Sequence, residues 1–209
     1  DEYEVDESVK ARMDNGNVVG DFAMGLFGDY VEVTATKEDG ALDLSKMIAK
    51  TKECIANGVQ NICEASFDFC GLYCAVDILR KDGDGYSIYE VKSATDIKVV
   101  YIYDVSYQKY VLEKCGVNVK HTYLVYINNE YVRGKELDIK QVFNVRNVDE
   151  LGAQEYGNVE GLLQGAEELL ADEQEPRIDI SINCFVPYKC GFWKYCSQHL
   201  PKPSVFDMY

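Results

Sequence analysis

Two carboxylates and a lysine near the middle of the sequence have the types and the spacing for metal-dependent chemistry. Asp77 lies in one apolar run, and Glu90 and Lys92 are two residues apart in the next. Because side chains alternate along a strand, Glu90 and Lys92 are expected on one face. A glycine-rich turn at 83–85 predicts a hairpin that brings the three side chains together.

Asp77 and Glu90 are predicted to hold Mg²⁺ or Mn²⁺, hard cations that take oxygen ligands and retain water molecules. The backbone carbonyl of Val91 can add a third oxygen. A metal here lowers the pKa of water and stabilises charge at phosphorus, while the Lys92 ammonium can orient the nucleophile or offset developing charge. The alternative for these residue types alone is an exposed strand that carries a salt bridge.

Helical and strand-like segments follow one another in an order that can position this group. Apolar residues recur at close to 3.6-residue spacing over 8–27 and over 43–57, which predicts two helices. Three short β-type runs at 62–69, 72–80 and 86–92 predict a three-stranded meander. The remaining predicted elements are a helix at 102–115, a buried strand at 122–127 and a helix at 148–171.

This order predicts an α/β fold in which a mixed sheet is flanked by helices. The length of 209 residues and the hydrophobic content of 47% suit a single domain over 1–209. Its closing residues, 201–209, resemble a linker, so further domains of the same protein are expected. The predicted parts are N-terminal helices at 1–58, a core at 59–145, a helical segment at 146–183 and a Cys-rich tail at 184–199.

The charge balance argues against a general nucleic-acid coat protein. Lys and Arg number 21 against 36 Asp and Glu, which gives a net charge of −15, whereas non-specific binding depends on basic residues that neutralise phosphates. Much of the acid is concentrated at 1–7 and 167–175. A local basic channel remains compatible with this composition.

Composition also bounds the compartment. No stretch is long and apolar enough to span a bilayer, and the first seven residues are acidic where a signal peptide would be basic. We therefore expect a soluble, cytoplasmic protein with reduced thiols and no membrane partner. Five of its eight cysteines are expected to be packing residues: Cys54, Cys63, Cys70, Cys74 and Cys115.

Four segments together resemble the PD-(D/E)XK nuclease superfamily, in particular its RecB-like and CRISPR-associated exonuclease branch. They are Cys63-Glu64-Ala65, residues 75–79, the stretch Glu90-Val-Lys-Ser-Ala-Thr95, and the helix that carries Gln108. The similarity runs over 16–196. It implies a restriction-endonuclease-like αβββαβ core and Mg²⁺- or Mn²⁺-dependent cleavage of DNA that is single-stranded or has free ends, most often as an exonuclease.

The resemblance assigns a role to each matching residue. Asp77 and Glu90 correspond to metal ligands, Lys92 to the catalytic lysine, and Gln108 to a helix glutamine that organises the substrate or the lysine. Asp104 lies one helical turn before Gln108 and shares its face. This face is therefore expected to turn toward the strand ends that bear Glu90 and Lys92.

The chain departs from the branch at two places. Leu112 stands where the tyrosine of Gln-x-x-x-Tyr is usual, and 16–20 lacks the metal-binding histidine of Gly-x-x-x-His. Glu64 or Asp21 can substitute for that histidine as a metal ligand. A structural ion pair accounts for Glu64 equally well.

The C-terminal cysteines are spaced Cys184-x5-Cys190-x5-Cys196, and they resemble a segment of the same branch that binds a 4Fe-4S cluster. A cubane cluster takes four thiolates, so the fourth ligand is expected outside this chain, in the complete protein. Zinc bound with His199 and ordinary packing thiols are the alternatives. The three sulfurs are predicted to converge.

Two functions of different classes follow. The first is a divalent-metal-dependent DNase, favoured by the intact set of Asp77, Glu90 and Lys92. The second is a catalytically weak nuclease-fold module that binds nucleic acid or docks to partner domains, favoured by the acidity of the chain and the missing histidine.

Overall fold

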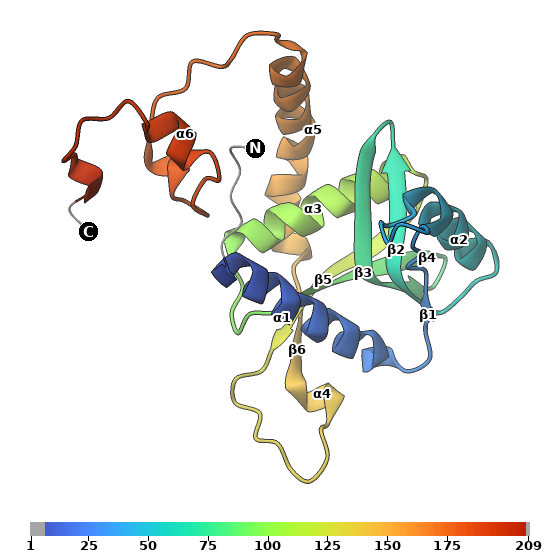
Figure 1. Ribbon diagram of the computed structural model, residues 1–209. Coiled ribbons are helices and arrows are strands. Elements are labelled where there is room, and N and C mark those ends of the chain that lie inside the picture. The colour runs from blue at the N-terminus through green and yellow to red at the C-terminus, as the bar shows by residue number, and fades with distance from the viewer. Residues whose placement is uncertain (1–6, 208–209) are drawn as a thin grey trace. The chain divides into compact units, whose positions relative to one another are not determined.

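A computed structural model describes residues 7–207, and residues 15–164 contain one six-stranded sheet with helices on its faces (Figure 1). The strands lie in the sheet in their order along the chain: β1 (Val31–Glu32), β2 (Asn61–Phe69), β3 (Leu72–Asp82), β4 (Gly85–Lys92), β5 (Val119–Ile127) and β6 (Phe143–Asn147). The α-helices are α1 (Glu7–Ala23), α2 (Leu44–Ala56), α3 (Val99–Lys114), α4 (Ile139–Val142), α5 (Asp149–Ala171) and α6 (Trp193–Ser197), and the 3-10 helices are η1 (Met24–Phe27), η2 (Ile182–Cys184) and η3 (Val205–Asp207).

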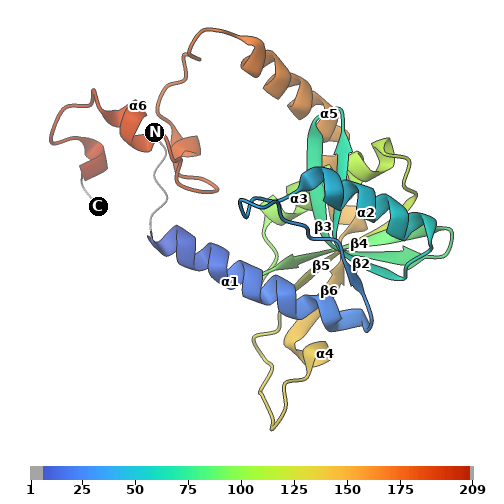
Figure 2. The ribbon, with the colours of Figure 1, turned by 45° about the vertical axis from the view of Figure 1, so that its right-hand side comes forward.

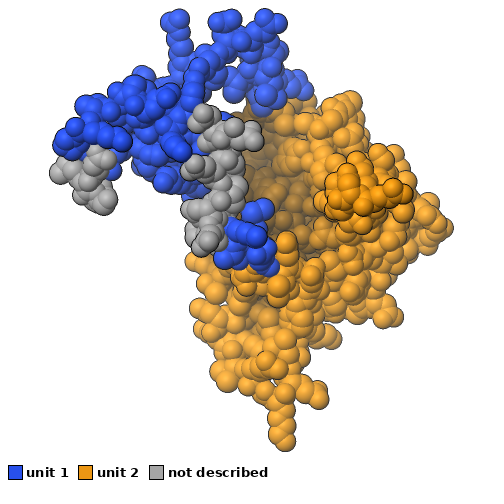
Figure 3. All heavy atoms as spheres, in the orientation of Figure 1, with its two compact units in different colours: residues 1–14, 165–209 blue, residues 15–164 orange. Residues whose placement is uncertain are grey.

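The chain divides into two compact units, which Figure 3 colours separately. The larger unit, residues 15–164, contains the whole sheet. The smaller consists of residues 1–14 and 165–209, and in it an aromatic cluster of Phe185, Trp193 and Phe206 joins η2, α6 and η3, with ring centroids 4.7 to 6.0 Å apart.

The predicted meander is confirmed. Strands β2, β3 and β4 pair antiparallel through two tight turns. The first turn, Cys70–Gly71, has φ of 52° and 87° at its two residues, which is the type I′ geometry that matches the twist of a two-residue hairpin. The second turn is Gly83–Asp84, between the paired residues Asp82 and Gly85.

Helix α3 then crosses over to β5, which pairs parallel with β4, and β6 adds an antiparallel edge. Together with the parallel β1–β2 pair, this confirms the predicted mixed sheet flanked by helices. Strands β1 and β6 and helix α4 were not predicted from the sequence, because elements of two to five residues are too short to show a period. Helix α3 also begins three residues earlier than predicted.

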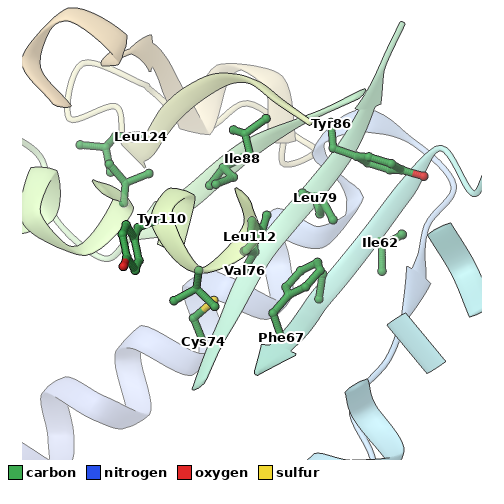
Figure 4. Packing of buried hydrophobic residues seen from close by; sticks show 14 of the residues in the cluster. Ile62, Phe67, Cys74, Val76, Leu79, Tyr86, Ile88, Tyr110, Leu112 and Leu124 are labelled. Atoms are coloured by element: carbon green, nitrogen blue, oxygen red, sulfur yellow. The ribbon is translucent and has the colours of Figure 1, made fainter. Parts of the chain in front are cut away.

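Two apolar layers fix the sheet between helices. One face packs against α2, α3 and the first half of α5, with Leu112 of α3 beside Val76 of β3 in the cluster of Figure 4. The other face packs against α1, η1 and α4 through Ala23, Leu26 and Val142. In Figure 2 the strands accordingly lie between α2 and α1.

Buried thiols contribute to these layers only in part. Cys54, Cys63 and Cys74 are buried, as predicted, but Cys70 and Cys115 are exposed. The packing role predicted for these two cysteines is wrong, because Cys70 occupies a hairpin turn and Cys115 follows the last turn of α3. Among residues 7–207, no helix combines the length and apolarity needed to cross a membrane.

Gly85 allows β4 to approach the segment before β5. The carbonyl oxygen of Asn118 accepts a hydrogen bond from the Tyr86 N–H at 2.9 Å, and a Cβ at Gly85 would overlap with that oxygen. Gly85→Ala is therefore expected to lower the free energy of unfolding by about 1–3 kcal/mol in urea denaturation.

Gly157→Ala is the matched control for this substitution. No atom lies within 4 Å of a Cβ placed on Gly157, which is inside α5, and alanine is the better helix former by about 0.5–1 kcal/mol. This control is expected to stabilise the protein. A Gly85→Ala variant as stable as the wild type would contradict the close approach of β4.

Candidate functional site

The β3–β4 ladder stops where the site begins. Its last paired residues on this side are Ile78 and Tyr89. Asp77 is the next residue of β3, and its carboxylate takes the place of a backbone acceptor: its Oδ2 accepts the N–H of Val91, two residues beyond Tyr89 on β4, at 2.6 Å. The interruption places Asp77 beside Glu90 and Val91 in the gap between two diverging strands.

Lys92 lies between two carboxylates. Its Nζ donates to Glu90 Oε1 at 2.7 Å and also pairs with Asp104 Oδ2 on α3. The predicted face sharing of Glu90 and Lys92 is thus confirmed. Burial alone would lower the pKa of Lys92, but the Glu90 and Asp104 carboxylates outweigh it and raise that pKa above its ordinary value. The Lys92 side chain is therefore an ammonium at any working pH.

Helix α3 turns its polar face toward these residues, as predicted. Gln108 Nε2 donates to Glu90 Oε2 at 2.8 Å and lies 3.4 Å from Asp104 Oδ1. Gln108 is only 4% exposed, and its Oε1 has no hydrogen-bond partner among the described residues. A buried carbonyl oxygen without a donor is costly, so this atom is suited to a ligand or a water molecule in the site.

Glu64 lies directly across from Asp77. The flanking ladder pairs are Cys63 with Ile78 and Ala65 with Val76, which leaves Glu64 opposite Asp77. Glu64 has φ of 58°, a left-handed conformation that costs an L-residue about 1–2 kcal/mol. This kink breaks the face alternation of β2 and brings a third carboxyl group toward the gap.

Crowding of carboxylates shows in their pKa values. Burial raises the pKa of Asp77 to about 7; the Val91 N–H and Lys92 oppose this, while Glu64 and Asp104 add to it. Burial likewise raises the pKa of Glu64 to about 7, with Glu90 the strongest charged neighbour in the same direction. Burial and the Asp77 charge raise the pKa of Glu90 well above its ordinary value. These carboxyl groups therefore keep their protons to a higher pH than they would in water.

These groups fit a hard divalent cation. The donors are carboxylate oxygens of Glu64, Asp77 and Glu90 and the unpartnered Oε1 of Gln108, and Mg²⁺ and Mn²⁺ prefer such a set. As the side chains stand, residues 7–207 contain no group of three or more His, Cys, Asp or Glu residues arranged around a metal position. Both Glu90 oxygens already have donors, Lys92 and Gln108. The metal ligation predicted for Asp77, Glu90, Val91 and Glu64 stays a prediction.

Three contacts of the site were not predicted from the sequence. Asp104 pairs with Lys92, Lys92 Nζ lies 5.5 Å from the Tyr101 ring centroid, and Asn15 Nδ2 of α1 donates to Ser93 Oγ at 2.7 Å. The only signal in the sequence was the four-residue step from Asp104 to Gln108. A contact between Asn15 and Ser93, 78 residues apart, has no local signature.

At the two places where the sequence differs from the nuclease branch that it resembles, the structure has apolar or acidic groups. Leu112, at the usual tyrosine position, is fully buried in the core, and the neighbouring Tyr110 turns its hydroxyl toward Glu160 at 3.3 Å. Asp21, one candidate substitute for the missing histidine, lies close enough to Glu64 to help raise its pKa. Of the two substitutes, Glu64 is the one that faces Asp77.

No family model and no curated protein matches this chain.

The three C-terminal cysteines belong to the smaller unit. Cys184 ends η2, Cys196 lies in α6, and the Cys190 N–H donates to the Cys184 carbonyl at 2.8 Å. All three side chains are half-buried. Three thiols are one fewer than a 4Fe-4S cluster takes, so these cysteines alone do not complete a cluster site. Convergence of the three sulfurs and the cluster itself remain predictions.

Metal content of the full-length protein after anaerobic purification tests the cluster prediction, because the fourth ligand is expected outside this chain. A 4Fe-4S cluster gives a brown protein with broad visible absorption and equal amounts of iron and sulfide, whereas zinc leaves the protein colourless. Cys190→Ser is expected to abolish the colour and leave the Asp77 and Glu90 site intact. A protein without iron, sulfide or zinc would contradict both metal readings and leave packing thiols.

The raised carboxyl pKa values predict a pH-dependent stability of the metal-free protein. Between pH 4 and 7 the folded state binds more protons at Asp77 and Glu64 than the unfolded state, so stability falls as pH rises through this window. Asp77→Asn keeps an oxygen to accept the Val91 N–H and removes the charge. In a chelator at pH 8 it is expected to raise the free energy of unfolding by on the order of 1–3 kcal/mol.

The extra stability of Asp77→Asn over the wild type should shrink as the pH falls toward 5, where the Asp77 carboxyl group of the wild type is already protonated. Glu136→Gln, on an exposed loop, is the control and is expected to change stability by less than about 0.5 kcal/mol at either pH. A destabilised Asp77→Asn protein at pH 8 would contradict the crowding of charge at this site.

Proposed function

We propose that this chain is a divalent-metal-dependent nuclease that hydrolyses DNA phosphodiester bonds. One observation carries the proposal: four carboxyl groups gather at a mostly buried gap of the sheet, where a single ammonium pairs with two of them. The four are Glu64, Asp77, Glu90 and Asp104, and the ammonium is that of Lys92. Such an excess of oxygen ligands is expected to recruit a hard cation.

The roles of the side chains follow from their contacts. Asp77, Glu90 and Glu64 would hold the cation, and Gln108 would hold Glu90 in place through its amide. Lys92 keeps its proton, so it cannot act as a base; it can orient a nucleophile or offset charge on a phosphate oxygen. A bound Mg²⁺ or Mn²⁺ would supply Lewis acidity toward water and the phosphodiester.

The substrate class rests on the resemblance to the RecB-like and CRISPR-associated exonuclease branch. We infer action on DNA that is single-stranded or has free ends, since that branch acts on such substrates. The acidity of the chain, with 36 acidic and 21 basic residues, agrees with a local site better than with an extended nucleic-acid coat.

The acidity and the donors on both Glu90 oxygens also favour a second candidate function. In this reading the chain is a catalytically weak module that binds nucleic acid or docks to partner domains. It would bind an end-labelled strand without shortening it in Mn²⁺.

A cleavage assay in Mn²⁺ distinguishes the nuclease from the catalytically weak module. The wild type is expected to shorten end-labelled single-stranded or free-ended DNA, and Glu90→Gln is expected to lose at least about 100-fold in rate because a ligand charge is removed at constant volume. Glu136→Gln is the matched control, with the same substitution on an exposed loop, and should cleave like the wild type. Unchanged cleavage by Glu90→Gln would remove the assignment.

Asp104 is predicted to position Lys92. Asp104→Asn removes the ion pair on α3 and leaves the contact of Lys92 with Glu90. We expect kcat to fall about tenfold, the cost of one charge-assisted hydrogen bond, while Mn²⁺ affinity by calorimetry stays within about twofold. Loss of Mn²⁺ binding in this variant would show instead that Asp104 is a ligand.

A further inference from the structure

A polar cavity lies at the far end of the β3–β4 hairpin from Asp77. It has a volume of about 230 Å³ and is lined by Arg80, Lys81, Asp82, Gly83, Ser87 and Tyr89. Tyr89 belongs to the apolar cluster on the η1 side of the sheet, and the Arg80 guanidinium carbon lies 4.7 Å from the Phe27 ring centroid of η1. The cavity therefore opens on the face of the sheet opposite to α3.

The Arg80 guanidinium lies over the Phe27 ring and beside the Tyr89 hydroxyl but has no acidic partner among the described residues. No carboxylate within residues 7–207 forms an ion pair with this guanidinium, and its Nε is buried without a hydrogen-bond partner. In a chain of net charge −15, acidic partners are plentiful. A half-buried arginine that lacks one is poised for an anion from outside.

Asn61 of β2 is the ladder partner of Arg80 of β3, and the amide oxygen of Asn61 also lacks a hydrogen-bond partner. A small shift could join this oxygen to Arg80 Nε. Arg80 lines the cavity, and its planar guanidinium fork suits the oxygens of a phosphoryl group.

Of the other groups of the cavity, the Tyr89 hydroxyl suits an anion and the Asp82 carboxylate opposes one. Burial raises the pKa of Tyr89, so its hydroxyl remains a donor at neutral pH. The one carboxylate in the lining, Asp82, accepts a hydrogen bond from Ser87 Oγ at 2.8 Å. Lys81 adds no ammonium here, because its Nζ lies next to Gly58 at the end of α2.

We propose that this cavity binds a phosphoryl group through the Arg80 guanidinium. The group can come from free phosphate or a nucleotide, or from the backbone of a nucleic-acid strand. The proposal is independent of cleavage, since the cavity shares no residue with the Asp77 and Glu90 site.

The test is a titration with inorganic phosphate in a chelator, at constant ionic strength against chloride, read from the NMR signal of the Arg80 Nε–H and by calorimetry. Arg80→Gln is expected to weaken phosphate binding about tenfold or more, the loss expected for a charge-assisted contact. Lys81→Gln removes the same charge from the next residue and is expected to change affinity less than about twofold.

Asp82→Asn provides a test of opposite sign. It removes the carboxylate that repels an anion, so phosphate should bind more tightly. Arg80→Lys keeps the charge and loses the planar fork, and it is expected to bind more weakly than the wild type. Circular dichroism of each variant checks that the fold is retained.

A parallel arm measures anisotropy of a labelled single strand in chelator and identifies the source. If the strand is the source, Arg80→Gln weakens strand binding and phosphate competes with the strand; if the source is free phosphate or a nucleotide, strand binding is unchanged. If Arg80→Gln loses phosphate binding, the proposal is supported whether or not strand binding is weakened as well. Equal phosphate affinity in wild type and Arg80→Gln, or an equal loss in Lys81→Gln, would overturn it.

Discussion

Asp77 accepts the Val91 N–H at the point where β3 and β4 stop pairing, and the remainder of the site depends on this contact. The side chain replaces a missing ladder acceptor, so the strands can separate without leaving a buried N–H unsatisfied. The opening admits Gln108 from α3 and, from the opposite strand, the kinked Glu64. The Asp77 carboxylate is thus both a structural hydrogen-bond acceptor and a predicted metal ligand.

The same arrangement is electrostatically unfavourable, because it buries several carboxyl groups close together. Burial raises the pKa values of Glu64, Asp77 and Glu90, repulsion among their charges adds to this, and for Asp77 and Glu90 Lys92 offsets part of it. Structures keep such crowding mainly where function requires it. A divalent cation would remove the cost, and in its absence the ammonium of Lys92 and bound protons partly substitute for it.

Much of the fold and of the central site could be predicted from the sequence, because the relevant signals are local. Strand alternation places Glu90 beside Lys92, and a helical four-residue step places Asp104 with Gln108. The left-handed Glu64 could not be predicted, since a glutamate gives no sign of positive φ. Nor could the Asn15 contact with Ser93 or the short strands β1 and β6, which tertiary packing alone determines.

The central claim is that the gap between β3 and β4 holds a divalent cation. The most direct test is a crystal structure of the chain grown with Mn²⁺, with anomalous diffraction measured at the manganese edge. We predict one strong peak within about 2.0–2.4 Å of carboxylate oxygens of Asp77 and Glu90, with Lys92 still paired to Asp104. A fully occupied Mn²⁺ elsewhere, or none at this position with the Lys92–Glu90 ion pair unchanged, would contradict the account.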